Sequence, residues 1–316
     1  MYTLPKFVEF REEGPREGFQ IESKTYPLKE RARLVDALSE TGVKRIQVGS
    51  FVSPRAVPSM ADAEALFAAI TPRRGVQYTA VWLNEQGFRR AAKTPRVYLY
   101  GKMVVYTTDA FARKNNNCSA AELKKRQLDM LPLFDEMGVP LEEAYILTAF
   151  GCNFEGPVPV EAVTDGVRFV ADTCTERGKP LPQIVLADTM GWANPEQIKR
   201  VIHAVRETVP EARVGLHLHD TRGLGPANFY AALQMGVDLF DSCVGGLGGC
   251  PFAAFKDPRA AGNICTEDMV FLCEELGIET GIDLEKMIEA ARIAEQIFQR
   301  PLPGKIMHSG SLKAFR

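Results

Sequence analysis

Two histidines stand two residues apart where a short β-branched run ends. His217 and His219 belong to the sequence His217-Leu-His-Asp220, which follows a predicted strand at residues 214–217. Because residues i and i+2 of a strand point to the same face, we expect both imidazoles to face one way. Imidazoles on one face can bind a divalent ion if oxygen ligands converge from other loops. The pattern favours a metal site over a pair of hydrogen-bonded core histidines.

A cation, a carboxylate and an amide lie close together in Gly14–Gln20, just after the first predicted strand. Arg16 can bind a carboxylate or carbonyl oxygen through its guanidinium group. Glu17 can supply an anionic metal ligand. The Gly-Pro pair is also typical of a solvated turn, so this segment by itself leaves both interpretations open.

A glycine-rich segment, Gly245–Pro251, follows the last predicted strand and contains Cys250. Its glycines permit a close approach of backbone to ligand, and a thiol there can serve as a proton donor or nucleophile. The spacing is not GxGxxG, so dinucleotide binding is not favoured. Nearby, Asn263 offers an amide oxygen to a metal. Three cysteines on predicted helices or their flanks are expected to be small buried apolar side chains: Cys118, Cys174 and Cys273.

Short β-branched runs alternate with longer amphipathic stretches along most of the chain. The predicted strands are residues 7–10, 45–48, 77–82, 97–99 with a possible extension to 105, 144–147, 184–186, 214–217 and 239–244. The predicted helices are residues 29–41, 61–70, 85–92, 120–137, 160–177, 195–208, 226–235, 267–276 and 284–298. The alternation favours an α/β fold, a (β/α)8 TIM barrel with additional C-terminal helices. We divide it into a barrel domain, residues 1–280, and a C-terminal helical extension, residues 281–316.

Local signals refine these elements. Ser119 and Glu122 form a capping-box pattern, and Asn194 stands as an N-cap before a proline. Pro132 is expected to kink or split its helix. Residues 301–316 are expected to be an irregular extension that orders on the barrel or on a second subunit.

The overall composition excludes several classes of protein. The chain has 38 Lys and Arg against 40 Asp and Glu, which gives no global attraction to nucleic acid. The longest uncharged stretch, residues 223–237, is shorter than the roughly 20 residues of a membrane span. The seven cysteines are odd in number and form no CxxC pair, which indicates a reducing compartment. With no leader pattern at the N-terminus, we expect a cytoplasmic protein.

Taken together, these motifs resemble those of the 3-hydroxy-3-methylglutaryl-CoA (HMG-CoA) lyase family of metal-dependent barrel lyases. The matching stretches are residues 14–20, 50–54, 188–191, 217–221, 246–251 and 262–268. The resemblance implies a Mg²⁺ or Mn²⁺ ion and an acyl-CoA substrate, with CoA as part of that substrate. It also implies cleavage to acetyl-CoA and a keto acid, which is acetoacetate for the parent substrate. We further expect a homodimer.

The resemblance also implies roles for individual residues. The implied metal ligands are Glu17, His217, His219 and Asn263. The implied catalytic residues are Arg16, Glu17, Asp188, His217 and Cys250. The implied substrate-binding residues are Arg16, Gln20, Gln47 and Ser50. In this interpretation the ion acidifies the substrate hydroxyl, Arg16 stabilises the developing oxyanion, and Cys250 protonates the enolate carbon while its loop closes over the site.

The chain departs from the family pattern at several positions. Glu17 replaces a metal-binding Asp, Gln47 replaces an acidic side chain, and a family Arg is replaced around Glu143. The interval between Cys250 and Asn263 is longer than usual, with residues 255–259 inserted. These departures keep other readings open: a lyase for another 3-hydroxyacyl-CoA such as citramalyl-CoA, a Claisen-type synthase, a non-heme iron oxygenase or a non-catalytic metal-binding relative.

Overall fold

The computed structural model describes residues 4–253 and 262–316, and the chain forms two compact units. Unit 1 contains residues 100–239 and 250–253 together with residues 4 and 5. Unit 2 contains residues 6–99, 240–249 and 262–316. The longer interval predicted around residues 255–259 lies outside the described residues.

Unit 2 is built on strands in the order β3-β2-β1-β10. Their bounds are β1 (Glu9–Glu12), β2 (Arg45–Ser50), β3 (Gln77–Val81) and β10 (Leu239–Ser242). The β1–β2 and β2–β3 pairs are parallel. The helices of this unit are α1 (Gly14–Ile21), α2 (Leu28–Ser39), α3 (Ala63–Ala69), α4 (Glu85–Lys93), α10 (Thr266–Glu275), α11 (Leu284–Phe298) and α12 (Ile306–Ser309), with 3-10 turns η1 (Pro58–Met60), η2 (Val244–Gly246) and η4 (Leu312–Phe315).

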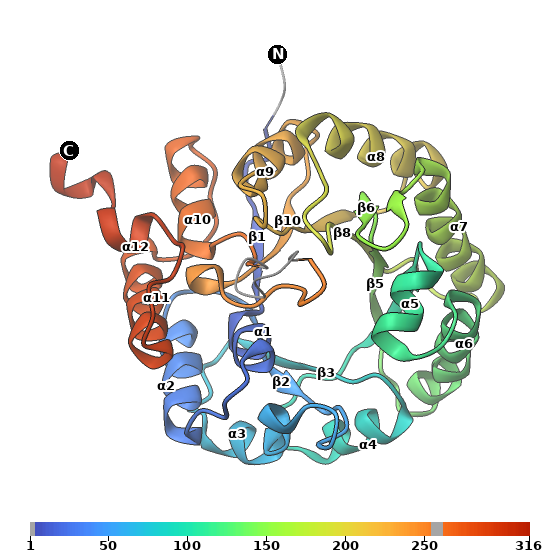
Figure 1. Ribbon diagram of the computed structural model, residues 1–316, viewed down its shortest axis with the longest axis horizontal. Coiled ribbons are helices and arrows are strands. Elements are labelled where there is room, and N and C mark those ends of the chain that lie inside the picture. Colours follow the sequence, from blue (N-terminus) through green and yellow to red (C-terminus); the bar gives the residue numbers. More distant parts are fainter. Residues whose placement is uncertain (1–3, 254–261) are drawn as a thin grey trace. The chain divides into compact units, whose positions relative to one another are not determined.

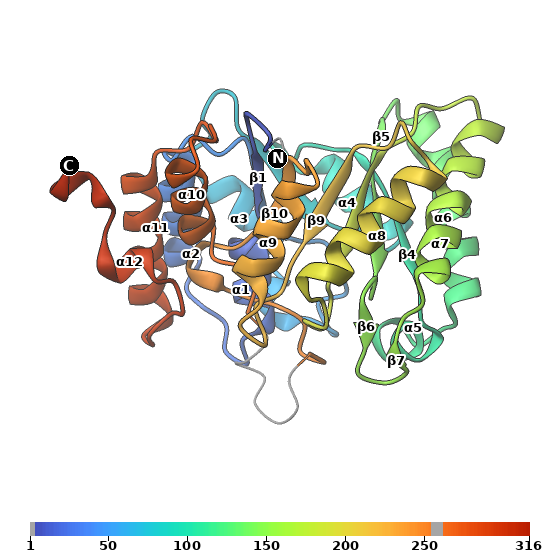
Figure 2. The same cartoon turned by 90° about the horizontal axis from the view of Figure 1, so that it is seen from above.

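The C-terminal helices of unit 2 pack together: α11 contacts both α10 and α2, and α10, α11 and α12 lie in one group (Figure 2). The backbone N–H groups of Lys305 and Ile306 donate to the carboxylate of Asp268, which ties the tail to α10. The tail therefore contains α12 and η4, and the expectation of a wholly irregular segment was wrong. The expected domain division at residue 280 stays a prediction.

Unit 1 is built on strands in the order β9-β8-β5-β4. Their bounds are β4 (Gly101–Tyr106), β5 (Leu141–Leu147), β8 (Gln183–Ala187) and β9 (Val214–His217), and all three neighbouring pairs are parallel. The helices are α5 (Asp109–Asn116), α6 (Ala120–Glu136), α7 (Val160–Glu176), α8 (Pro195–Thr208) and α9 (Gly225–Gln234). Helices α6, α7 and α8 cover one face of the strands (Figure 1). A short hairpin, β6 (Gly151–Cys152) and β7 (Gly156–Pro157), follows β5.

Each of the eight predicted strands is present; β9 has the predicted bounds, and the other seven have shifted ends. β1 begins at Glu9 rather than residue 7, and the fourth strand begins at Gly101 because Val97 makes only an isolated bridge to Tyr78. The capping box at Ser119 and the N-cap at Asn194 are confirmed.

Other local features differ from what the sequence indicated. Helix α6 continues through Pro132 without splitting, and the kink expected there as the alternative stays a prediction. Helices α1 and α5 were not predicted, because each is only eight residues long and rich in Gly, Pro or Asn. Among the described residues, no helix combines the length and apolar character needed to cross a membrane.

Candidate active site

Helix α1 carries Arg16 and Glu17 in its first turn, directly after β1. Pro15 occupies one of the first helical positions, where its missing N–H needs no partner, so the Gly-Pro pair begins a helix rather than a solvated turn. The backbone N–H groups of Arg16 and Glu17 donate to the carbonyl oxygen of Glu13 at 3.1 and 2.9 Å. Both side chains are therefore fixed relative to the end of β1.

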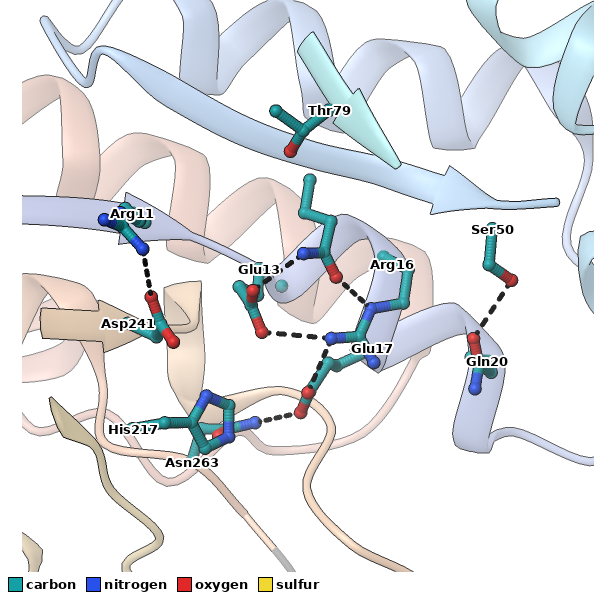
Figure 3. Close-up of polar contacts among 12 residues, drawn as sticks. Arg11, Glu13, Arg16, Glu17, Gln20, Ser50, Thr79, His217, Asp241 and Asn263 are labelled. Carbon is teal, nitrogen blue, oxygen red and sulfur yellow. Dashed lines mark hydrogen bonds and ion pairs between the residues drawn. The ribbon is translucent and has the colours of Figure 1, made fainter. Parts of the chain in front are cut away.

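The Arg16 guanidinium is surrounded by acceptors (Figure 3). Its Nη2 donates to Glu13 Oε2 at 3.0 Å and to Glu17 Oε1 at 2.8 Å, and its Nε donates to Gln47 Oε1. Burial alone would lower the pKa of Arg16, but the Glu17 and Glu13 carboxylates outweigh burial and raise that pKa above its ordinary value. Arg16 is thus a permanent cation in a largely buried position.

The second carboxylate oxygen of Glu17 lies against Asn263. Glu17 Oε2 accepts hydrogen bonds from Asn263 Nδ2 at 2.6 Å and from the backbone N–H of Gly249 at 2.9 Å. Asn263 Nδ2 also donates to the carbonyl oxygen of Leu247 at 2.9 Å. The amide oxygen of Asn263 makes no hydrogen bond to any described residue. A carboxylate and an available amide oxygen, both typical ligands of hard divalent cations, are therefore held together.

The predicted substrate-binding residues lie on α1 and β2 of the same unit. Gln47 and Ser50 are buried on β2, and Gln20 is on α1. The Ser50 hydroxyl donates to Gln20 Oε1 at 3.2 Å (Figure 3). Together with Arg16, these residues form one polar cluster at the junction of α1 and β2.

The glycine-rich segment approaches Glu17 closely. Gly248 has a φ of +76°, and a Cβ at this position would clash with the Cβ of Glu17 and lie 2.9 Å from its carbonyl carbon. Only glycine allows this approach. At Gly248 the glycines bring backbone against Glu17, and the expected approach of backbone to a ligand stays a prediction.

Two buried carboxylates that the sequence did not indicate hold this segment in place. Glu12 Oε1 accepts from the backbone N–H groups of Gly14 at 2.8 Å and Val244 at 2.9 Å, and Glu12 Oε2 accepts from the Thr266 hydroxyl at 2.6 Å. Glu267 Oε2 accepts from the backbone N–H of Gly245 at 3.0 Å. Each anchor contacts backbone far away in sequence, so no local pattern points to it.

Both anchoring carboxyl groups are perturbed by their surroundings. Burial raises the pKa of Glu12 to about 7 and that of Glu267 to about 8, although the bonds from backbone N–H groups oppose the shift. The carboxyl groups next to the glycine-rich segment therefore titrate close to neutral pH.

In unit 1, His217 ends β9 and His219 follows two residues later. Both rings are buried, and their Nε2 atoms lie 3.1 Å apart. The expectation that the two imidazoles lie on one side is confirmed. Two ring nitrogens at this separation share one proton or bind a common cation.

Asp188 lies at the end of β8 in the same unit. Its Oδ1 accepts from the backbone N–H groups of Trp192 at 2.7 Å and Ala193 at 3.1 Å, and its own N–H donates to the carbonyl oxygen of His217 at 2.8 Å. Burial raises the pKa of Asp188 to about 7, and these N–H groups oppose the rise. Its catalytic role stays a prediction.

Elsewhere in this unit, buried Glu143 of β5 pairs with Lys102 of β4 at 3.3 Å.

Cys250 is the partly exposed cysteine, since the other six are buried. The residues after it are held by Asn153, at the β6–β7 hairpin. Asn153 Nδ2 donates to the carbonyl oxygens of Phe252 at 2.8 Å and Ala253 at 3.0 Å, while Asn153 Oδ1 accepts from Trp192 Nε1 at 2.7 Å. The Asn153 amide nitrogen therefore holds this segment, while its amide oxygen is held by Trp192.

Comparison with known proteins places these residues in a family. The family model described as HMGL-like matches residues 8–294. This chain belongs to the HMGL-like family. The mouse mitochondrial hydroxymethylglutaryl-CoA lyase is 37% identical over 309 residues, which cover 97% of this chain and 90% of that protein. The hydroxymethylglutaryl-CoA lyase YngG of Bacillus subtilis is 35% identical over 307 residues, covering 95% and 96% of the two chains.

Solved structures of HMGL-like proteins agree with the fold. The Bacillus subtilis HMG-CoA lyase has a TM-score of 0.87 at 34% identity, covering 97% of this chain and 98% of that one. An Acinetobacter baumannii HMG-CoA lyase in complex with coenzyme A and 3-methylmalate has a TM-score of 0.86 at 34% identity, covering 99% and 98%. The predicted (β/α)8 barrel class is confirmed. The chain is a carbon–carbon lyase of the HMG-CoA lyase type, so the synthase, oxygenase and non-catalytic readings are not favoured.

Proposed function

We propose that this HMGL-like chain cleaves a 3-hydroxyacyl-CoA of the HMG-CoA type at a divalent cation held by Glu17, Asn263, His217 and His219. The observation that carries the proposal is the pairing of Glu17 with Asn263, which leaves an amide oxygen beside a carboxylate. Parallel strands of a barrel present their carboxyl ends on one face. Residues that follow β1 and β9 can therefore contribute to a single site.

The donor set suits the proposed cation. A carboxylate, an amide oxygen and two imidazoles are ligands that Mn²⁺ accepts, and the oxygen ligands also suit Mg²⁺. The 3.1 Å separation of the His217 and His219 Nε2 atoms supports the same interpretation, because each neutral imidazole offers one lone pair. When bound, the cation would lower the pKa of the substrate's 3-hydroxyl group.

The remaining chemistry belongs to the chain's own residues. A base takes the hydroxyl proton, and the bond between C2 and C3 then breaks, so that C3 becomes the ketone of the keto acid and the electron pair of the bond forms a thioester enolate. Arg16 donates to the thioester oxygen as negative charge develops there. Cys250 then gives its proton to C2, which completes acetyl-CoA.

The other site residues bind the substrate or support the site. Gln20, Gln47 and Ser50 offer hydrogen bonds to the acyl group from the cluster of α1 and β2. Asp188 is proposed as a catalytic residue, which is supported by its buried carboxyl group beside the strand that carries His217.

The same proposal includes a cytoplasmic homodimer. Seven free cysteines fit a reducing compartment. The exposed apolar side chains of Leu312 and Phe315 in η4 offer a surface for a second copy. Light scattering after size exclusion, with the wild type and Phe315→Ser, measures the mass. A monomeric wild type would remove the dimer from the proposal.

The metal site is tested by titrating Mn²⁺ into the purified protein by calorimetry and by assaying HMG-CoA cleavage in the same samples. Variants Glu17→Ala, Asn263→Ala, His217→Ala and His219→Ala are expected to lose cation affinity by at least about tenfold each. His203→Ala is the matched control, because His203 is exposed on α8. Wild-type affinity in all four variants, or cleavage that persists in excess chelator, would overturn the proposed site.

A further inference from the structure

Glu13 closes a ring of hydrogen bonds with two residues of the proposed site. It precedes α1, and its side chain is only 5% exposed. Glu13 Oε1 accepts from Gln47 Nε2 at 2.7 Å, and Glu13 Oε2 accepts from Arg16 Nη2 at 3.0 Å. The third side is the bond from Arg16 Nε to Gln47 Oε1. Each pair in the ring therefore shares one hydrogen bond, although the sequence assigned no role to Glu13.

The ring fixes the orientation of the Gln47 amide. Arg16 Nε is a donor, so the amide must turn its oxygen toward the guanidinium and its NH₂ group away from it. That NH₂ group is buried with Gln47, and Glu13 Oε1 is the acceptor that satisfies it. Without the Glu13 carboxylate, the NH₂ group of Gln47 would be a buried donor without an acceptor. If the amide rotated to avoid this, it would lose the hydrogen bond from Arg16 Nε.

The same ring determines which part of Arg16 remains available. A guanidinium group has five N–H donors. Nε uses its N–H on Gln47, and Nη2 directs its two toward Glu13 and Glu17. Both N–H groups of Nη1 have no partner among residues 4–253 and 262–316. The ring therefore holds the guanidinium plane with one complete NH₂ group left for a ligand.

We propose that Glu13 is a positioning residue that aims Arg16 Nη1 at the thioester oxygen of the substrate. This inference rests on the proposed role of Arg16 in the reaction. When Glu17 binds a cation, its charge is shared with that ion, and Glu13 remains the carboxylate that balances the buried guanidinium. Glu13 thus keeps Arg16 in place while Glu17 serves the metal.

An exchange of side chains tests this role. Glu13→Gln cannot accept from both Arg16 and Gln47, and we expect kcat to fall by about 10- to 100-fold with little change in KM, because one buried donor loses its partner. Gln47→Glu places a second carboxylate against that of Glu13, so the kcat of this variant should also be lower than that of the wild type. The double variant Glu13→Gln/Gln47→Glu restores one amide, one carboxylate and the three bonds, so its kcat should recover to within about threefold of the wild type.

Controls separate this effect from a general loss of charge or fold. Glu30→Gln makes the same chemical change at an exposed pair on α2 and should keep wild-type kcat. Thermal melts accompany every variant. If Glu13→Gln melts below the assay temperature, Gln47→Met removes the amide from the other side of the ring, and the same loss of kcat is expected. Wild-type kcat in a folded Glu13→Gln or Gln47→Met variant would overturn the proposal, as would a folded double variant slower than both single variants.

A second readout needs no turnover. In protein labelled with ¹⁵N-arginine, the Nε–H signal of Arg16 should exchange slowly with solvent in the wild type and the double variant, and quickly in Glu13→Gln. An unchanged exchange rate in Glu13→Gln would overturn the proposal that Glu13 holds Arg16 in position. If the wild type cleaves no thioester, the proposed function fails, while this exchange measurement still decides whether Glu13 holds Arg16.

Discussion

Replacing Glu267 by glutamine should change how the stability of the protein depends on pH. Burial raises the pKa of Glu267 to about 8 from an ordinary value of 4.5, and its Oε1 atom is buried without a hydrogen bond to any residue that the structure describes. The folded protein therefore holds a proton that the unfolded chain releases between about pH 4.5 and pH 8. Because unfolding releases this proton, the free energy of unfolding falls as the pH rises through that window.

The size of the effect follows from the same shift. One proton released on unfolding changes the free energy of unfolding by about 1.4 kcal/mol per pH unit. Glu12, with a pKa of about 7, adds a slope of the same sign up to that pH. Glu267→Gln removes only the Glu267 contribution. The stability of the variant relative to the wild type should therefore rise by roughly 3.5 kcal/mol between pH 5 and pH 8.

Urea unfolding of both proteins at several pH values measures this difference, and taking the difference cancels the titration of other groups. Glu274→Gln is the matched control, since Glu274 is exposed on the same helix, α10. The free energy of unfolding of Glu274→Gln should change with pH in parallel with that of the wild type. Parallel curves for Glu267→Gln and the wild type would show that Glu267 is ionised throughout this range, and would refute the reasoning.

Three further changes test how the site is held together. Gly248→Ala forces a Cβ into Glu17 at a positive φ, so Mn²⁺ affinity should fall by at least about tenfold; unchanged affinity by calorimetry would contradict this. Cys250→Ser should slow kcat by roughly 10² to 10⁴ with little change in KM or melting temperature, and full kcat would show that the proton comes from another group. Asn153→Leu removes two donors from the segment after Cys250, so the thiol should react faster with a disulfide reagent and kcat should fall by about tenfold; an unaltered thiol rate would exclude this anchoring role.

Much of the fold could be predicted because the parallel strands carry their own pattern. The β-branched run at residues 214–217 coincides with β9, and the Asn194-Pro195 signal coincides with the start of α8. The pattern failed where elements are short. Helix α1 was missed because Gly14 and Pro15 resemble a turn, although a proline at the start of a helix costs no hydrogen bond.

The site was predictable as a set of residue types but not as a network. Arg16, Glu17 and Asn263 were selected from motifs, and the structure brings them together. Glu13 and Glu12 were not selected, because each also binds a partner that lies tens or hundreds of residues away in sequence. A buried carboxylate that holds distant backbone or side chains leaves no local signal.

The most direct test of the central claim, that this chain is a metal-dependent lyase for 3-hydroxyacyl-CoA thioesters, is a mass-spectrometric screen. The purified protein is incubated with a panel of such thioesters, including HMG-CoA and citramalyl-CoA, with Mg²⁺ or Mn²⁺ and with excess chelator. We expect acetyl-CoA and a keto acid in equal amounts from at least one thioester, and no products in chelator. Folded protein that cleaves no thioester with either metal, or that cleaves one equally well in chelator, would contradict the account.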